Sequence, residues 1–165
     1  MQPSAIDVVV SDAGPLIALG RLELLGLLPS LFSHIHVPEA VLAECVARPA
    51  LPDAQQIRRA CETGELIVCA AEPITAGNLG PGERSAIGKA LELGTALLAD
   101  DLAARRHAQS RGLVVIGTLG VLILAKRKNL LPEIAPLIEE LRSSGYRLSD
   151  AAVHAALAAA NERDV

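Results

Sequence analysis

Five acidic residues stand where predicted strands end or predicted helices begin in this chain. They are Asp12, Glu44, Glu83 and the adjacent pair Asp100 and Asp101. Carboxylates gathered from distant segments repel one another unless a positive charge lies between them, and a divalent cation is the usual solution. The pattern therefore points to metal-assisted chemistry on a phosphate-containing substrate.

Short apolar runs alternate with helical patterns along the whole chain. Strands are predicted at residues 8–11, 34–37, 66–70, 95–99 and 113–116. Helices are predicted at residues 16–19, 22–31, 38–47, 54–63, 83–93, 102–111, 119–128, 132–143 and 150–161. Strands separated by helices indicate an α/β fold with a mainly parallel sheet of about five strands, covered on both faces. With no linker or repeat in sight, residues 1–165 are predicted to form one domain.

The two strand-end positions fall on the same edge of such a sheet. Asp12 follows the first predicted strand, and Asp100 and Asp101 follow the fourth. The carboxyl ends of parallel strands form the ligand-binding edge of an open α/β sheet. Capping of the next helix by the side chain explains Asp12 when it is taken alone. Two adjacent acids are more than one cap needs, so one of the pair is expected to face the sheet edge.

The two glutamates give signals of different strength. Glu83 shares a helical stripe with apolar residues four, seven and eight positions later, which predicts a carboxylate at the rim of the core. The alternative for Glu83 is a solvated first-turn acid favoured by the helix dipole. Glu44 projects away from the apolar side of its helix, where a solvent-exposed pair with Arg48 explains it adequately.

Composition narrows the classes of function. The formal net charge of −4 argues against a broad basic surface, and Phe32 and Tyr146 are the only aromatic residues of the three ring types Phe, Trp and Tyr. A platform of exposed rings for stacking RNA bases is therefore excluded. Nucleic acid would have to be contacted by local basic clusters, which are by default solvated helix faces.

The expected location is the cytoplasm. Three cysteines without a CxxC spacing read as reduced thiols. The N-terminal residues lack the basic start and long apolar stretch of a secretion signal. The longest apolar stretch, residues 113–125, is shorter than the roughly 20 residues that cross a bilayer, so no membrane association is expected.

Several segments together resemble the PIN-domain proteins, metal-dependent ribonucleases that include the toxins of many bacterial toxin–antitoxin pairs. The matching segments are VVVSDAGPLIAL, HIHVPEAVLAEC, LGPGERSAIGKALELG, ALLADDLAARRHAQSRGLVVIGTLGVLILAKRKNLL and the last helix pair. They span almost the whole chain. The resemblance is strongest to a branch described as predicted nucleic-acid-binding proteins. It implies a single PIN-like domain, a three-layer α/β/α sandwich.

The resemblance assigns roles to the acids. It implies Mg²⁺ or Mn²⁺ ligands and catalytic residues at Asp12, Glu44, Glu83, Asp100 and Asp101. For Glu44, only the resemblance favours a role as a metal ligand over a solvent-exposed pair with Arg48. Many members have Asp where this chain has Glu83, and the last acid aligns to either member of the aspartate pair, with Asp100 slightly favoured. Thr118 matches a hydroxyl that some members place near the metal, and helix capping explains it equally well.

The implied activity is hydrolysis of RNA phosphodiester bonds by a metal-dependent endoribonuclease. Candidate contacts to the RNA backbone are Arg105, Arg106 and Lys126. The toxin analogy implies a small antitoxin protein as a partner. A homodimer is also expected. The Ala-rich last helix has little bulk, so it would pack closely against the domain or against a second copy.

Other interpretations are weaker. A haloacid-dehalogenase-like phosphatase needs a second acid two residues after Asp12, where Gly14 stands, and a receiver domain places its acid pair after the first strand. No GxxxxGK[ST] loop and no GxGxxG after a strand is present. A non-catalytic PIN-like module that binds RNA or a partner protein fits the low positive charge, but the clustered acids argue against it.

Overall fold

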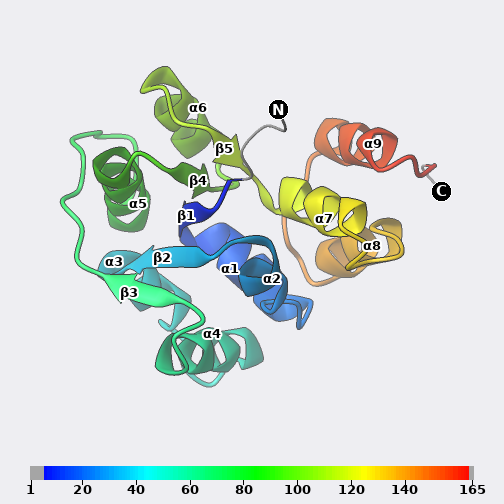
Figure 1. The fold of residues 1–165 in the computed structure, drawn as a ribbon, viewed down its shortest axis with the longest axis horizontal. Helices are drawn as coiled ribbons and strands as arrows, with labels where there is room; N and C mark the ends of the chain where they lie inside the picture. The colour runs from blue at the N-terminus through cyan, green and yellow to red at the C-terminus, as the bar shows by residue number, and fades with distance from the viewer. Residues whose placement is uncertain (1–5, 164–165) are drawn as a thin grey trace.

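A parallel sheet of five strands forms the centre of the structure, a computed structural model that describes residues 6–163. The strand order is β3-β2-β1-β4-β5 (Figure 1). The strands are β1 (Val8–Ser11), β2 (His34–Pro38), β3 (Ile67–Cys69), β4 (Ala96–Leu98) and β5 (Val115–Ile116). The prediction of an α/β fold with a parallel sheet is confirmed.

The central strands are buried on both faces. Val9 and Val10 of β1 and Leu98 of β4 are completely inaccessible to solvent. A parallel sheet with helices on both faces needs continuous apolar strands of this kind, because neither face meets water. The border strands β3 and β5 have three and two residues, and Val68 in the middle of β3 is 40% exposed.

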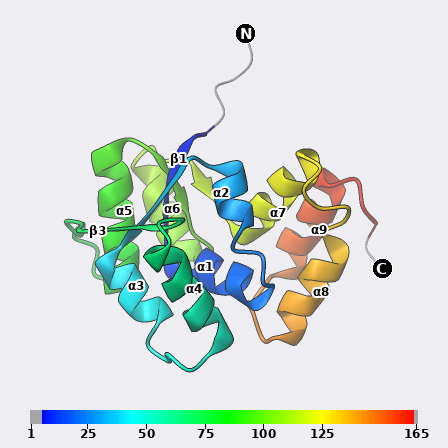
Figure 2. The same cartoon turned by 60° about the horizontal axis from the view of Figure 1, so that its bottom comes forward.

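Nine helices within residues 6–163 surround this sheet. They are α1 (Ala13–Arg21), α2 (Leu27–Leu31), α3 (Glu39–Cys45), α4 (Pro52–Glu62), α5 (Pro81–Leu93), α6 (Leu102–Ser110), α7 (Thr118–Arg127), α8 (Ala135–Ser143) and α9 (Asp150–Ala159). Helix α5 packs across β1, β2 and β4, and α6 packs on β5, whereas α1 packs against α4 and α7 on the other side (Figures 1 and 2).

The order of the strands fixes where a ligand would bind. The chain leaves β1 toward β2 and β3, and then returns to the other side of β1 to form β4 and β5. This reversal opens a crevice at the carboxyl edge of the sheet between β1 and β4. Asp12 directly follows β1, and Asp100 lies two residues after β4. The fold therefore brings these two aspartates to the same crevice.

Some helix boundaries differ from the prediction. The helix predicted at 22–31 is only α2, because α1 continues to Arg21 and a turn with Glu23 at φ 57° separates the two. The helix predicted from residue 132 begins at Ala135. Its first amide groups are bound by a carboxylate from the far end of the chain, which no local pattern reveals. No helix of the described chain combines the length and apolarity needed to cross a membrane.

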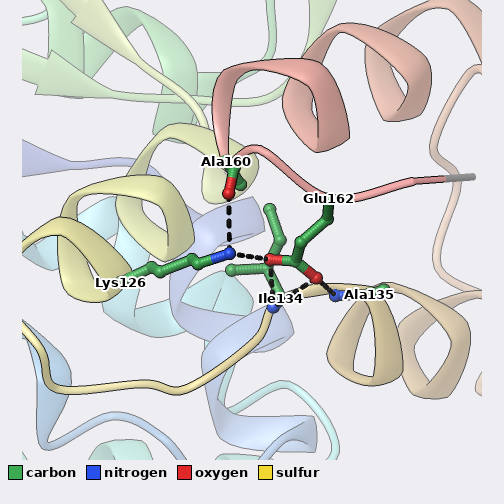
Figure 3. A network of polar contacts seen from close by, with 5 residues as sticks. All are labelled: Lys126, Ile134, Ala135, Ala160 and Glu162. Carbon is green, nitrogen blue, oxygen red and sulfur yellow. Dashed lines mark hydrogen bonds and ion pairs between the residues drawn. The ribbon is translucent and has the colours of Figure 1, made fainter.

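A polar network fastens the segment after α9 to the rest of the molecule (Figure 3). The Lys126 ammonium, from α7, donates to the Ala160 carbonyl at 2.6 Å and to Glu162 Oε2 at 2.8 Å. The Glu162 carboxylate also accepts hydrogen bonds from the amides of Ile134 and Ala135, each at 2.9 Å. We call these five residues the C-terminal clamp. It joins α7, the start of α8 and the end of α9.

Candidate functional site

The five predicted acids line one cavity of about 460 Å³, which we call the acidic pocket. They reach it from separate elements: the end of β1, helix α3, the first turn of α5 and the residues after β4. The acids are Asp12, Glu44, Glu83, Asp100 and Asp101. The carboxyl edge of the sheet therefore gathers all of them, although their separation in the sequence reaches 89 residues.

Asp12 lies deepest in the acidic pocket. Its side chain is 5% exposed, and its backbone amide donates to the Leu98 carbonyl at 2.9 Å, which ties the end of β1 to β4. Asp12 occupies the N-cap position of α1, but its side chain makes no capping hydrogen bond. The capping interpretation of Asp12 is therefore wrong. Its Oδ1 atom is buried and has no hydrogen-bond partner.

The electrostatics of Asp12 follow from this placement. Burial raises the pKa of Asp12 from 3.8 to about 7, and the charges of Glu44, Glu83 and Asp101 add to the effect against the lowering contribution of the Ala13 amide. A carboxylate in this position costs free energy near neutral pH unless a proton or a cation neutralises it. Near neutral pH the burial of Asp12 therefore favours its protonated form or a cation beside it.

Glu83 is held at the rim of the pocket by the close packing of α5 against the loop before it. The Ile74 amide donates to the Arg84 carbonyl at 3.1 Å. The Glu72 carbonyl lies against Gly88, where a Cβ atom would clash with it. Burial raises the pKa of Glu83, with Asp101 and Glu44 adding to the effect and the Gly80 backbone opposing it. The prediction of a half-buried carboxylate at the core rim agrees with this position.

Glu44 approaches the pocket from α3 although its side chain is largely exposed. A Cβ atom on Gly82 would lie 3.4 Å from Glu44 Oε2, so the missing side chain of Gly82 allows the two helices to meet closely. Within residues 6–163, Glu44 forms no ion pair with Arg48. The surface-pair interpretation is therefore wrong, and the acid faces the other carboxylates.

The adjacent aspartates divide two tasks between them. Asp101 is the N-cap of α6, where Oδ2 accepts the Ala104 amide at 3.0 Å. Asp100 turns toward the sheet edge, where its Oδ1 accepts the Thr118 amide at 2.7 Å and its Oδ2 accepts the Thr118 hydroxyl at 2.5 Å. The expectation that one member of the pair faces the sheet edge is met by Asp100. Thr118 is the first residue of α7 and not its cap.

Tyr146 is a site residue that the sequence did not single out. It lies in the loop between α8 and α9, lines the acidic pocket, and donates a hydrogen bond from its hydroxyl to Asp100 Oδ2. Burial and the Asp100 charge raise the pKa of Tyr146, so its phenol stays a donor. The Arg21 guanidinium lies 5.9 Å from the centre of the Tyr146 ring. Arg147, the next residue, also lines the pocket and was likewise missed.

The predicted RNA-contacting residues are scattered. Arg105 is near the acids, and its Nη1 donates to the Ala99 carbonyl at 2.9 Å. Arg106 is exposed on α6 and does not line the acidic pocket. The structure does not bring Lys126 to this pocket either, because its ammonium belongs to the C-terminal clamp. Neither Arg106 nor Lys126 lines the acidic pocket, and their contact with the RNA backbone stays a prediction.

The donor chemistry of the acidic pocket suits Mg²⁺ or Mn²⁺. Both ions prefer carboxylate oxygens, and the buried Asp12 Oδ1 lacks any other partner. The carboxyl groups are not drawn together to ligating distances, since no three acidic, His or Cys side chains in the described chain are arranged to hold a metal ion. The residues fit the ion by type and by charge, and Asp12, Glu83 and Asp100 are those that would hold it.

Comparison with known proteins agrees with the fold. A family model described as a PIN domain matches residues 8–162. Among solved structures, the chain is similar to a PilT N-terminus domain protein from the hyperthermophilic archaeon Sulfolobus solfataricus, with a TM-score of 0.51 and 20% identity over 70% of this chain and 90% of that one. At this identity the likeness shows the fold alone. A search of curated proteins finds no match.

Proposed function

This chain belongs to the PIN-domain family, and we propose that it is a metal-dependent endoribonuclease that hydrolyses RNA phosphodiester bonds. One observation carries the proposal. The buried carboxyl of Asp12, with an oxygen that no group within residues 6–163 satisfies, lies in a pocket lined by four further acids. Repulsion between the carboxylates and the burial of Asp12 destabilise the folded protein. A divalent cation bound among them would relieve this destabilisation, so the cluster would favour binding of the ion.

The side chains of the acidic pocket would have different roles in hydrolysis. A bound Mg²⁺ or Mn²⁺ would acidify a water molecule and offset the charge of the scissile phosphate. Asp12 would supply a fixed oxygen at the base of the pocket. The Thr118 and Tyr146 hydroxyls hold the Asp100 carboxylate in one orientation. Glu83 and Glu44 line the same pocket from α5 and α3 and would add negative charge toward the cation.

The Glu83→Gln variant tests the proposal. It removes one charge from the pocket rim and is expected to lower Mn²⁺-dependent cleavage of single-stranded RNA by more than the roughly 100-fold that loss of an outer-shell partner costs. The matched control is Glu39→Gln, an exposed first-turn acid on α3 outside the pocket, which should cleave at the wild-type rate. Product formation is followed on a gel with Mn²⁺, with Mg²⁺ and with EDTA.

Failure of the wild type to cleave any RNA with either metal would favour the non-catalytic alternative, a PIN-like module that binds RNA or a protein. The separated carboxyl groups are the observation that supports this second function. Equal rates for Glu83→Gln and Glu39→Gln would leave a nuclease whose active site lies elsewhere.

The proposal extends to partners and location. We propose a cytoplasmic toxin that is restrained by a small antitoxin protein and forms a homodimer. The free thiols Cys45, Cys61 and Cys69 suit a reducing compartment. Purification of the tagged protein from its source organism should yield a small co-purifying protein, and light scattering should give twice the mass of one chain. A lone monomer in both experiments would contradict the toxin assignment and the dimer.

A further inference from the structure

A second cavity, of about 830 Å³, lies between α7 and α9. One wall is formed by α7 and the other by the small side chains of α9, which keep the cavity open. We call it the α7–α9 groove, and its walls include Leu119, Ile123 and Arg127 on α7 and Ala152, Ala155 and Ala159 on α9. Positions 152, 155 and 159 recur at helical spacing, so they present one face of α9 to the groove.

The groove is continuous with the acidic pocket. Asp100, Leu102 and Arg147 line both cavities. A ligand lying in the groove would therefore reach the carboxylates without leaving the surface of the protein.

The charges of the groove are opposite to those of the pocket. Among the described residues, its titratable lining residues are Arg105, Arg127 and Arg147, with Asp100 as the single acid at the shared end. The chain as a whole carries a formal charge of −4, so this concentration of guanidinium groups is local. Arginine suits phosphate because its planar fork offers paired donors.

Both walls of the groove are fixed. Ser149 caps the start of α9 by accepting the Ala152 amide at 3.1 Å, and the C-terminal clamp holds the end of α9 against α7. Arg105 is anchored by its bond to the Ala99 carbonyl beside Gly117, where a Cβ atom would lie 2.8 Å from Nη1. The groove is thus preformed, which lowers the entropy cost of binding a flexible ligand.

We infer that the α7–α9 groove binds a single-stranded RNA segment and leads it into the acidic pocket, an inference that rests on the proposed nuclease function. The arginines would hold phosphates. The aliphatic walls would contact base and sugar faces, which a single strand exposes and a duplex buries in its stack. RNA bases can stack on the planar guanidinium groups of these arginines, which would replace the aromatic side chains that this protein largely lacks. Arg147, which lines both cavities, stands where the strand passes from groove to pocket.

The test measures binding without catalysis. A fluorescent single-stranded RNA of about 12 nucleotides is titrated with the protein in EDTA, and anisotropy is read at several salt concentrations. Arg127→Gln and Arg147→Gln are each expected to weaken binding about tenfold and to lower the salt slope by about 0.7. Lys128→Gln is the matched control, an exposed neighbour of Arg127 that does not line the groove.

A second pair of variants tests whether the open volume of the groove, and not only its positive charge, is needed for RNA binding. Ala155→Leu places bulk in the groove and should weaken RNA binding about tenfold, whereas Ala158→Leu, also exposed on α9 but not lining the groove, should bind as the wild type does. Unchanged binding by the two arginine variants would overturn the inference. Equal affinity for a duplex of the same sequence would overturn the single-strand assignment, as would binding of an acidic amphipathic peptide in place of RNA.

The inference and the proposed function fail separately. RNA binding through the groove by a protein that never cleaves it would leave the inference standing and remove the nuclease. Cleavage at wild-type rates by the arginine variants, with unchanged affinity, would leave the nuclease standing and remove the groove as its substrate path.

Discussion

Replacement of Asp12 by Asn is expected to stabilise the metal-free protein and to abolish RNA cleavage. Both effects come from the same buried carboxyl, whose pKa is raised from 3.8 to about 7. The folded state therefore binds this proton more tightly than the unfolded state does. Asp12 lowers stability progressively as the pH rises from about 4 to about 7, and the full penalty applies above that range.

The size of the effect can be bounded. A shift of about three pKa units corresponds to on the order of 4 kcal/mol, an upper bound because the neighbouring acids adjust their own protonation. Asp12→Asn should therefore unfold at clearly higher urea concentration than the wild type at pH 8 in EDTA, and the difference should nearly vanish at pH 4. Added Mn²⁺ should raise the midpoint of the wild type and leave that of the variant unchanged.

The control for this comparison is Glu39→Gln, which removes one exposed negative charge near the same sheet edge and should shift the midpoint little. Lower stability of Asp12→Asn at pH 8 would mean that the carboxylate holds the fold together. That result would contradict the description of the pocket as a strained site that receives a cation.

Replacement of Glu162 by Ala is the second change with a large expected effect. The carboxylate, only 11% exposed, bonds the Lys126 ammonium and the amides of Ile134 and Ala135. Its loss leaves the Ile134 and Ala135 amides without this acceptor and the Lys126 ammonium with only the Ala160 carbonyl, which should reduce the free energy of unfolding by roughly 2–4 kcal/mol. Thermal unfolding at pH 7 measures this loss, and Glu139→Ala, an exposed acid on α8, is the matched control.

The pH dependence of this effect has the opposite sign to that of Asp12. Burial alone would raise the pKa of Glu162, but the Lys126 ammonium and the two amides outweigh it and lower the pKa. The stabilisation is therefore complete above pH 4.5, the ordinary value, and is lost as the pH falls through the folded-state pKa. Equal melting temperatures for Glu162→Ala and Glu139→Ala at pH 7 would show that the clamp contributes nothing.

The sheet edge and its acids were accessible from the sequence because local patterns determine them. A buried strand ending in an acid gave Asp12 and the aspartate pair, and parallel topology placed them on one edge. Helical periodicity gave Glu83. Glu44 came only from the family resemblance, because its exposure on α3 leaves no pattern in the chain.

The long-range contacts of the site and of the C-terminal clamp could not be predicted from the sequence. Tyr146 bonds Asp100 across 46 residues, and Glu162 bonds Lys126 across 36. Pairings at this separation depend on how the C-terminal helices pack, which residue spacing does not encode. The same contact keeps the Lys126 ammonium out of the acidic pocket. The sequence could not show this, because a basic residue near the end of a helix has the same local pattern whether it faces solvent or a distant carboxylate.

The borders of the sheet also bear on how copies of this protein can associate. Strand β3 has three residues and β5 has two. A foreign strand that docked on either side would gain only a few main-chain hydrogen bonds, so fibril-like growth by strand addition has little to build on. Copies of this protein that associate would therefore do so through helix surfaces. Contacts of that kind can form closed assemblies of defined size.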